Sequence, residues 1–479
     1  MNILFAASEL SPYAKTGGLG DVLAALPATL RERGHSVSCV LPLYRGLLEK
    51  LPGATLTDLE LSIPLGAATL TAKVWHAVSD TGVPLFLIQR DEYYDRGQLY
   101  GTSGGDYTDN SSRFIFFSKA VVELARYLDP VPQLLHLHDW QTALVPAFVR
   151  ARGLPFKTIY TIHNLAYQGN FWGLDFDLTN LPGEYFSAPG IEFHDHLNCM
   201  KGGITLAHQI TTVSPRYAEE IQTDTFGCGL NRVLGEHRHK LTGILNGVDY
   251  RVWNPKDDPL TAAPFHSGSL KGKAACKDAL LNDFKLPPSD APVFGCITRL
   301  AWQKGVDLIR AIMEPLLAEE ARVVLLGSGE PQFEDYFRTL AARHPGKVGV
   351  RIGFDEKLAH QIVAGSDFFL MPSLYEPCGL TQMYSLRYGT LPIVHETGGL
   401  ADSVEDYQPD PSLGGGGGTG FVFRPYSPAP FLDACTRALR LYRHKAELLR
   451  IRRQAMKREF SWDRSAAAYE EVYTRALKA

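Results

Sequence analysis

Residues 1–41 read MNILFAASELSPYAKTGGLGDVLAALPATLRERGHSVSCVL, and the fold class can be predicted from the pattern of this segment. The apolar run at 3–7 predicts a buried strand, the Gly-rich segment 17–20 predicts a turn, and the periodic apolar residues of 22–30 predict a helix. A second strand-like run follows at 36–41. Strand, loop, helix and strand in this order predict a βαβ unit, so we expect an α/β fold with parallel strands.

The same alternation continues along the chain and then starts again. Further strands are expected at 134–138, 158–162 and 209–213, and in the second half at 292–298, 322–326, 348–352, 368–371 and 391–394. We therefore expect two α/β domains with parallel strands, at residues 1–248 and 249–458, with the Asp-, Asn- and Pro-rich segment 246–264 as a hinge. Ligands are expected in a deep cleft between the domains, beyond the carboxyl ends of the strands.

The bulk composition limits the classes of protein to consider. A chain of 479 residues is longer than one ordinary domain, so more than one domain is expected. Its 45% hydrophobic and 21% charged residues are ordinary for a globular protein. The net charge of -4 argues against wholesale binding to nucleic acid or to an acidic membrane. No apolar run approaches the ~20 residues that cross a bilayer, and the N-terminus lacks the features of a signal peptide. With seven dispersed cysteines, an odd number, we expect a soluble cytoplasmic protein.

The first candidate binding segment is the Gly-rich loop KTGGLGD at 15–21, between the first predicted strand and helix. Glycine lets the backbone approach a ligand, a helix N-terminus offers N–H groups, and Lys15 adds a positive charge, so the loop suits a diphosphate. The loop matches neither the Walker A spacing nor the dinucleotide fingerprint. Because many strand-to-helix turns need glycine for geometry alone, a purely structural turn is the alternative.

Two polar segments follow later strands, HLHDW at 136–140 and HNLAYQG at 163–169. The two histidines of the first segment share one strand face, so a metal pair is conceivable. No third ligand is close in sequence, and we prefer hydrogen bonds to backbone or a carboxylate for them. We expect Asp139 to contact sugar hydroxyls and His163 with its neighbours to bind an uncharged polyol. For His163, the capping of a strand end is the alternative.

The second half of the chain carries two further candidate segments, TRLAWQKG at 298–305 and YEPCGLT at 375–381. Arg299 and Lys304 bracket a turn after a strand and would neutralise a leaving diphosphate, with solvated surface cations as the alternative. Glu376 lies in a turn that opens a predicted helix, where a carboxylate would hold sugar hydroxyls and stabilise positive charge at an anomeric carbon. The cysteine of this turn has no histidine partner in its sequence context and is interpreted as a packing residue.

Two other features are given no role in binding. The basic stretch 437–464 mixes its charges with apolar residues, which indicates a solvated helical face in preference to a nucleic-acid site. The five consecutive glycines Gly414–Gly418 predict a surface loop, because glycine contributes no side chain to a core.

Taken together, the motifs resemble the glycogen and starch synthase family over nearly the whole chain. They are, in order, KTGGLGDV, HDWQTAL, HNLAYQG, LNGVD at 245–249, TRLAWQKG, EPCGLTQM, ETGGLADSV at 396–404 and FSWDRSAAAYEEVY at 460–473. The resemblance implies the glycosyltransferase-B (GT-B) fold of two Rossmann-like domains, with a terminal helix at 459–479 that crosses back to the first domain. It also implies a retaining enzyme that transfers glucose from ADP-glucose to the non-reducing 4-hydroxyl of an α-1,4-glucan, with no metal and no further cofactor.

The resemblance assigns a role to individual residues. Glu376 would be the important carboxylate near the glucose, and Arg299 and Lys304 would hold the diphosphate. His163 would bond the transferred sugar. The other implied contacts are Lys15, Gly17 and Gly18 with the diphosphate and glucose, Tyr94 near the sugar, Asp139 and Asn164 beside His163, Asn246 in the cleft, Gly353 and Phe354 at the nucleobase, and Cys378, Gly379, Leu380 and Thr381 at the phosphates and glucose.

The chain departs from the family pattern at the nucleobase. Bacterial members have a Gly-Tyr pair where this chain has Gly353 and Phe354, so the stacking ring is kept and the hydroxyl is lost. The second glutamate of a wider retaining-transferase pattern is Tyr384 here, as in bacterial and plant synthases, which leaves Glu376 as the single carboxylate. UDP-glucose is the alternative donor. A two-domain transferase that forms sucrose or a small glycoside, and a non-catalytic glucan-binding protein, are the alternative functions.

Overall fold

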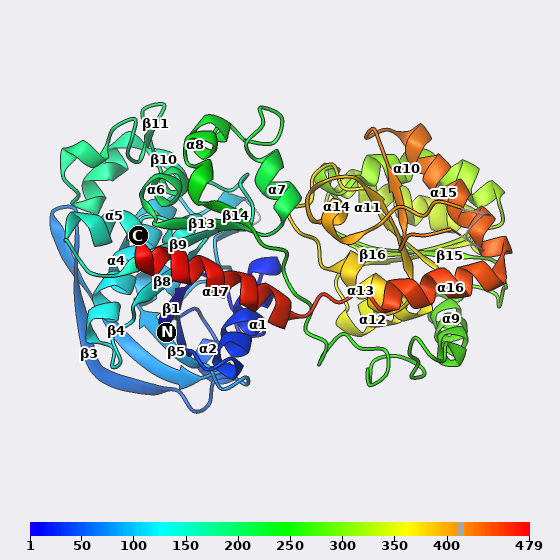
Figure 1. Ribbon diagram of the computed structural model, residues 1–479, viewed down its shortest axis with the longest axis horizontal. Coiled ribbons are helices and arrows are strands. Elements are labelled where there is room, and N and C mark those ends of the chain that lie inside the picture. Colours follow the sequence, from blue (N-terminus) through cyan, green and yellow to red (C-terminus); the bar gives the residue numbers. More distant parts are fainter. Residues whose placement is uncertain (103, 410–415) are drawn as a thin grey trace. The chain divides into compact units, whose positions relative to one another are not determined.

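The computed structural model describes residues 1–102, 104–409 and 416–479, and these form two compact units (Figure 1). Unit 1 comprises Met1–Gly247 together with Trp462–Ala479, and unit 2 comprises Val248–Ser461. The chain therefore leaves unit 1 once and returns to it for the last helix, α17 (Trp462–Lys478). Among the described residues, no helix is both long enough and apolar enough to cross a membrane.

Unit 1 is built on a nine-stranded sheet with the order β14-β13-β9-β8-β1-β2-β5-β4-β3. Neighbouring strands from β14 to β5 pair in parallel, whereas β4 and β3 extend the sheet in antiparallel fashion. The strands are β1 (Asn2–Ala6), β2 (Ser36–Pro42), β3 (Thr55–Leu65), β4 (Ala68–Val78), β5 (Pro84–Gln89), β8 (Leu134–His138), β9 (Lys157–Ile162), β13 (Gln209–Thr212) and β14 (Leu241–Gly243). Two small sheets contain β6 (Gly101–Thr102) and β7 (Gly105–Asp106), and β10 (Asn170–Trp172), β11 (Glu192–Phe193) and β12 (His196–Asn198).

The helices of unit 1 connect and cover these strands. They are α1 (Gly18–Glu32), α2 (Leu47–Lys50), α3 (Asp91–Tyr94), α4 (Asn110–Tyr127), α5 (Val145–Ala151), α6 (Cys199–Leu206), α7 (Pro215–Glu220) and α8 (Asn231–Glu236), with 3-10 turns η1 (Trp140–Thr142), η2 (Gly173–Thr179), η3 (Gly183–Tyr185) and η4 (Arg238–Lys240). The segment between β8 and β9 is divided into the two short helices η1 and α5. Pro146 lies in the first turn of α5, where its missing N–H costs little, so a new helix begins there.

Unit 2 contains a six-stranded parallel sheet with the order β17-β16-β15-β18-β19-β20. The strands are β15 (Val293–Ile297), β16 (Arg322–Gly327), β17 (Val348–Ile352), β18 (Phe368–Met371), β19 (Leu391–His395) and β20 (Phe421–Phe423). The helices are α9 (Lys271–Asp283), α10 (Val306–Ala318), α11 (Pro331–Arg343), α12 (Glu356–Gly365), α13 (Thr381–Arg387), α14 (Gly398–Ser403), α15 (Pro428–Arg443) and α16 (Lys445–Met456), with the 3-10 turn η5 (Trp302–Lys304). The strands predicted for both halves of the chain are confirmed, with small shifts at their ends.

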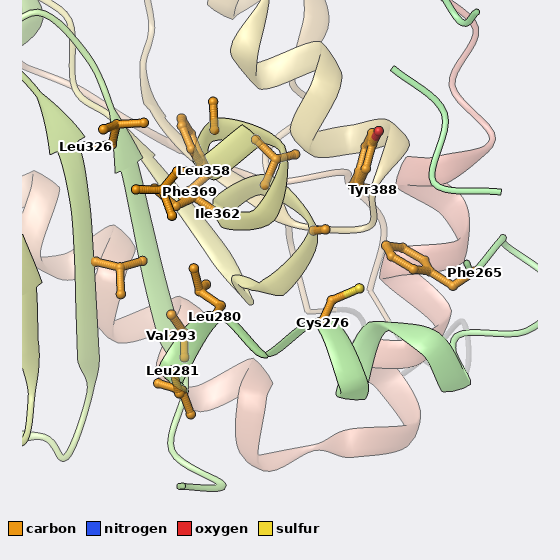
Figure 2. Close-up of a cluster of buried hydrophobic side chains, with 14 of the residues drawn as sticks. Phe265, Cys276, Leu280, Leu281, Val293, Leu326, Leu358, Ile362, Phe369 and Tyr388 are labelled. Atoms are coloured by element: carbon orange, nitrogen blue, oxygen red, sulfur yellow. The ribbon is translucent and has the colours of Figure 1, made fainter. Parts of the chain in front are cut away.

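One cluster of buried side chains joins the sheet of unit 2 to its helices α9, α12 and α16 (Figure 2). Leu280 of α9, Ile362 of α12 and Phe369 of β18 are fully buried in it. Burying one such side chain contributes about 1.5–3 kcal/mol. The cluster therefore holds β15 and β18, the strands whose loops carry Lys304 and Glu376.

Part of the glycine run is paired, which corrects the expectation of a surface loop. Gly414 and Gly415 lie outside the described residues. Gly417 exchanges two backbone hydrogen bonds with Gln408, of 3.0 and 3.1 Å, and the buried Gly416 donates its N–H to Glu447 at 2.9 Å. A Cβ on Gly416 would lie 1.9 Å from the Gln408 carbonyl oxygen, so the missing side chain allows this close approach.

Helix α17 is attached to unit 1 by both charged and buried polar contacts. Glu470 accepts two hydrogen bonds from the Arg33 guanidinium, at 2.9 and 2.7 Å, and lies 2.9 Å from the His35 ring. Tyr473 is buried and its hydroxyl lies 2.8 Å from His136 Nδ1, inside the sheet. Ser465 donates to the carbonyl of Leu245 at 2.6 Å. The end of the chain is therefore an integral part of the unit formed by its beginning.

The ion pair at Glu470 gives a prediction for acid stability. The Arg33 hydrogen bond, with help from His35, lowers the pKa of Glu470 to about 2, below the ordinary glutamate value. The ionised carboxylate therefore stabilises the folded state above that ordinary value, and the contribution is lost as the pH falls toward about 2. We expect Glu470→Gln to lower the free energy of unfolding by roughly 1 kcal/mol near neutral pH and by progressively less in acid.

Urea unfolding at a series of pH values checks this expectation. The matched control is Glu471→Gln, because Glu471 is the exposed neighbour of Glu470 on the same helix. A difference between wild type and Glu470→Gln that stays constant from neutral pH to strong acid would contradict the ionic origin of this contact.

Candidate functional site

The order of the strands determines where the candidate residues gather. In unit 1, β1 lies between β2 and β8, and in unit 2, β15 lies between β16 and β18. At these two places successive crossovers go to opposite sides of the sheet, which is where parallel α/β sheets bind ligands. The predicted segments follow β1, β8 and β9 in unit 1 and β15, β17 and β18 in unit 2.

The Gly-rich loop of unit 1 is held by hydrogen bonds to a carboxylate that the sequence analysis missed. Buried Glu9 accepts hydrogen bonds from the N–H groups of Thr16 and Gly17, at 2.8 and 3.1 Å, and from the hydroxyls of Thr16 and Tyr100, at 2.6 and 2.9 Å. The amide of Gly17, which we expected to face a diphosphate, is therefore already used inside the unit. The sequence signal that could have revealed this carboxylate was an acidic residue in the loop that follows the buried strand β1.

The glycines at the start of α1 are not required by the fold. A Cβ placed on Gly17 or Gly18 would meet no atom within 4 Å, and neither residue has a left-handed backbone conformation. Lys15 is exposed and its ammonium lies 2.6 Å from Asp21. A purely structural turn is thus disfavoured as the explanation of these two glycines, because the position that a side chain would occupy is open space above the loop.

A second group of candidates lies at the ends of β8 and β9. Asp139 accepts the N–H of His163 at 2.8 Å. Burial raises the pKa of Asp139 to about 7, against the lowering effect of the N–H groups of His163 and Asn164. Asp139 also has φ 55° and ψ -175°, a backbone conformation that costs energy in a residue other than glycine. Asp139 therefore fixes the loop that carries His163 and Asn164, in addition to any contact that it makes with a sugar.

The histidines of HLHDW form hydrogen bonds with the protein. His136 bonds to the hydroxyls of Tyr473 and Thr161, at 2.8 and 2.7 Å. His138 Nδ1 lies 2.9 Å from His163 Nε2. Within the described part of the chain, no group of three or more His, Cys, Asp or Glu side chains is placed to hold a metal ion. Burial lowers the pKa of His163 to about 3, so this ring is neutral at physiological pH.

In unit 2, the loops after β15 and β18 meet through a largely buried ion pair. The Lys304 ammonium lies 3.0 and 2.7 Å from the two Glu376 oxygens, and Ser373 donates to the same carboxylate at 2.9 Å. The side chains of Lys304 and Glu376 are 20% and 8% exposed. The nearby Arg299 is exposed, and its guanidinium donates to Gln303 at 3.3 Å.

Three glycines allow the loops of this site to approach one another. A Cβ on Gly305 would lie 2.0 Å from the Pro372 carbonyl oxygen, and one on Gly398 would lie 2.0 Å from that of Glu376. Gly399 donates its N–H to the Glu376 carbonyl at 3.1 Å. These glycines are required by backbone contact, unlike those of the loop in unit 1.

The turn that leads into α13 is fixed by one side chain. Gln382 Nε2 donates to the carbonyls of Cys378 and Gly379, at 3.0 Å each. Gly379 has φ 69°, which favours glycine there. Cys378 is buried, in line with its interpretation as a packing residue, while Leu380 and Thr381 are half-buried at the start of the helix.

The remaining predicted residues have different surroundings. Phe354, after Gly353 at the end of β17, is 85% exposed and presents an open aromatic face. Asn246 is buried, and its Oδ1 has no hydrogen-bond partner among the described residues. Tyr94 is fully buried and donates its hydroxyl to the Arg113 carbonyl at 2.8 Å. A direct contact of Tyr94 with a sugar is therefore not supported by this structure, because no part of its side chain reaches the surface.

Residues 2–236 match the family model described as starch synthase catalytic domain, and residues 280–458 match glycosyl transferases group 1. A glycogen synthase from Opitutus terrae is 46% identical to the chain over 485 residues, covering 100% of both proteins. A glycogen synthase from Myxococcus xanthus is 46% identical over 483 residues, covering 99% of each. The chain belongs to the glycogen and starch synthase family.

Solved structures agree with this membership. The catalytic domain of starch synthase IV from Arabidopsis thaliana, bound to ADP and acarbose, has a TM-score of 0.90 at 35% identity and covers 100% of this chain and 99% of its own. A sucrose-phosphate synthase from Thermosynechococcus elongatus has a TM-score of 0.61 at 16% identity over 100% of this chain and 99% of its own, which shows the shared fold alone. This member of the family is thus a glycosyltransferase with the GT-B fold.

The Lys304–Glu376 pair gives a prediction for this family member's stability. Lys304→Met leaves a buried carboxylate without its cation, and breaking a fully buried pair in this way costs roughly 3–5 kcal/mol. Because the Lys304 side chain is one-fifth exposed, we expect a loss of about 2 kcal/mol in urea unfolding. The double variant Lys304→Met/Glu376→Gln should recover most of this loss, since it also removes the charge.

The matched control is Arg443→Met, which breaks an exposed pair with Glu319 in the same unit. We expect Arg443→Met to change the free energy of unfolding by no more than about 0.5 kcal/mol. Equal stability of Lys304→Met and wild type would show that Glu376 does not depend on this cation.

Proposed function

We propose that the chain is a retaining glucosyltransferase that moves glucose from ADP-glucose to the non-reducing 4-hydroxyl of an α-1,4-glucan such as glycogen. The observation that carries the proposal is the Lys304–Glu376 pair at the point in unit 2 where the crossovers diverge. It occurs in a chain that aligns along its whole length with glycogen synthases. The ADP and acarbose bound by the Arabidopsis relative support an adenine nucleotide and a glucan-like sugar as ligands.

In the proposal, unit 2 binds the nucleotide part of the donor. Arg299 is exposed and loosely held, so its guanidinium can turn toward a diphosphate, and Lys304 supplies a second cation. The backbone of Cys378, Gly379, Leu380 and Thr381 seats the phosphates and glucose, and Gly353 with exposed Phe354 frames the base. These two cations take the charge of the leaving group, and the proposal includes no metal and no further cofactor.

The proposed contacts of unit 1 are with the sugar end of the donor. Lys15, Gly17 and Gly18 approach the diphosphate and glucose across the open space above the loop. His163 bonds to the transferred glucose from a loop that Asp139 holds in place. Asn164 and Asn246 complete this set, and the unsatisfied Oδ1 of Asn246 is a ready acceptor for a hydroxyl.

The proposed reaction breaks the bond between the anomeric carbon and the diphosphate oxygen and forms a bond to the acceptor's 4-oxygen on the same face. The acceptor's hydroxyl proton goes to the departing phosphate oxygen, and ADP leaves. His163 is a poor alternative base because burial lowers its pKa to about 3. The Glu376 carboxylate stabilises the positive charge that develops on the sugar, and losing such a group costs ~3 kcal/mol, about a hundredfold in rate.

Release of nucleoside diphosphate tests the proposal. Purified protein receives glycogen with ADP-glucose in one reaction and with UDP-glucose in another, and we expect ADP release that depends on glycogen. Release with UDP-glucose alone would overturn the choice of donor. Release that needs a small sugar in place of glycogen would favour the sucrose- or glycoside-forming alternative, and glycogen binding without release would favour the non-catalytic one.

The open space above Gly18 gives a second prediction. Gly18→Ala should leave the melting temperature unchanged, because its Cβ meets no atom within 4 Å. The added methyl group should obstruct the donor and raise its KM about tenfold, a loss of about 1.4 kcal/mol. The control is Gly53→Ala, whose Cβ also meets no atom within 4 Å and which lies in an exposed turn outside the candidate segments. An unchanged KM in Gly18→Ala would place the donor elsewhere.

We further propose that the reaction takes place in the cytoplasm of a bacterium. All seven cysteines are among the described residues, and none takes part in a disulfide. This arrangement suits a reducing compartment.

A further inference from the structure

The hydrogen bond between His138 and His163 bears on how the proposed site works, and the inference rests on the proposed role of His163. We propose that His138 is a positioning residue that keeps the proton of His163 on Nδ1, so that His163 presents an N–H donor to the transferred glucose.

His138 is rigidly held at the end of β8. Its side chain is fully buried, and its ring stacks on Phe5 with centroids 5.6 Å apart and an interplanar angle of 16°. The backbone of His138 exchanges hydrogen bonds with the Thr142 hydroxyl, at 2.8 and 3.0 Å. His138 Nδ1 therefore has a fixed position, 2.9 Å from His163 Nε2.

The surroundings of His138 Nε2 determine which of the two rings donates in this hydrogen bond. His138 Nε2 is buried and has no hydrogen-bond partner among the described residues. A proton on Nε2 would create a buried N–H group without an acceptor, and such orphaned donors are rare in native structures. The proton of His138 is therefore on Nδ1, and it is donated to His163 Nε2.

The state of His163 follows from that direction. Its Nε2 accepts a hydrogen bond, so a neutral His163 ring carries its single proton on Nδ1. Burial lowers the pKa of both histidines, which keeps both rings neutral. His163 is half-buried, and its Nδ1 forms no hydrogen bond within the described part of the chain. The remaining ring nitrogen of His163 is thus a donor, suited to a sugar hydroxyl or ring oxygen.

His136 provides a contrast on the same strand. It is as deeply buried as His138, but both of its nitrogens bond to hydroxyl groups, those of Tyr473 and Thr161, and it has no hydrogen bond to His163. A change at His136 disturbs the packing of this region without removing the donor to His163.

Two polar substitutions of His138 separate the loss of its hydrogen-bond donor from a disturbance of the packing around it. Asn carries its amide at the level of Nδ1, whereas Gln carries it near the level of Nε2. We expect His138→Asn to keep kcat within about threefold of wild type and His138→Gln to lower kcat by about 30-fold with little change in the glycogen KM. Similar melting temperatures for the two variants confirm that folding is not the cause. Equal kcat values for Asn and Gln would overturn the proposal.

A double-mutant cycle tests whether His138 acts through His163. His138→Gln should lower kcat no further in a His163→Ala background, because the acceptor of its proton is gone. Loss of the full 30-fold in that background would overturn the proposal. His136→Gln is the control. Any loss of kcat that it causes in the wild-type background should also appear in the His163→Ala background. Unchanged activity of His163→Ala would instead refute the proposed role of His163, so the two failures are distinguishable.

The tautomer can also be observed without turnover. In protein labelled with 15N-histidine, the signal that disappears in His163→Ala should show a protonated Nδ1 and an unprotonated Nε2. In His138→Gln the same signal should shift toward a mixture of tautomers. A His163 signal with its proton on Nε2 in the wild type would overturn the proposal.

Discussion

Parallel pairing obliges the loops that follow neighbouring strands to meet at one edge of the sheet, and the candidate site depends on this constraint. β1, β8 and β9 are neighbours in unit 1, and β15 and β18 are neighbours in unit 2. Segments far apart in the sequence thereby come within hydrogen-bond distance. His138 reaches His163 across 25 positions, and Lys304 reaches Glu376 across 72.

The glycines of the two units illustrate different physical demands. Gly305 and Gly398 are present because another backbone passes where a Cβ would lie. Gly17 and Gly18 have no neighbour at that position, so the fold does not explain them. Motif recognition treats all of these glycines alike, although the first pair serves packing and the second borders open space.

Three carboxylates close to the candidate residues are held by other polar groups, and this arrangement fixes the candidate side chains before a ligand arrives. Glu9 holds the Gly-rich loop, Asp139 holds the backbone of His163, and Ser373 shares the Glu376 carboxylate with Lys304. Each arrangement is costly to form in a low-dielectric interior unless its partners are satisfied. Rigid donors and acceptors of this kind suit a reaction that relies on electrostatic stabilisation.

The sequence by itself determined the alternation of strands and helices, because hydrophobic periodicity and Gly-rich turns are local properties. It also located Arg299, Lys304, Glu376 and His163 after predicted strands. It did not reveal β3 and β4, although the alternating pattern of residues 55–65 was available as a signal. The pairing of Lys304 with Glu376, the buried position of Tyr94 and the role of Glu9 were decided by tertiary structure. These features depend on which distant segments the sheet brings together, and no local pattern of residues encodes that proximity.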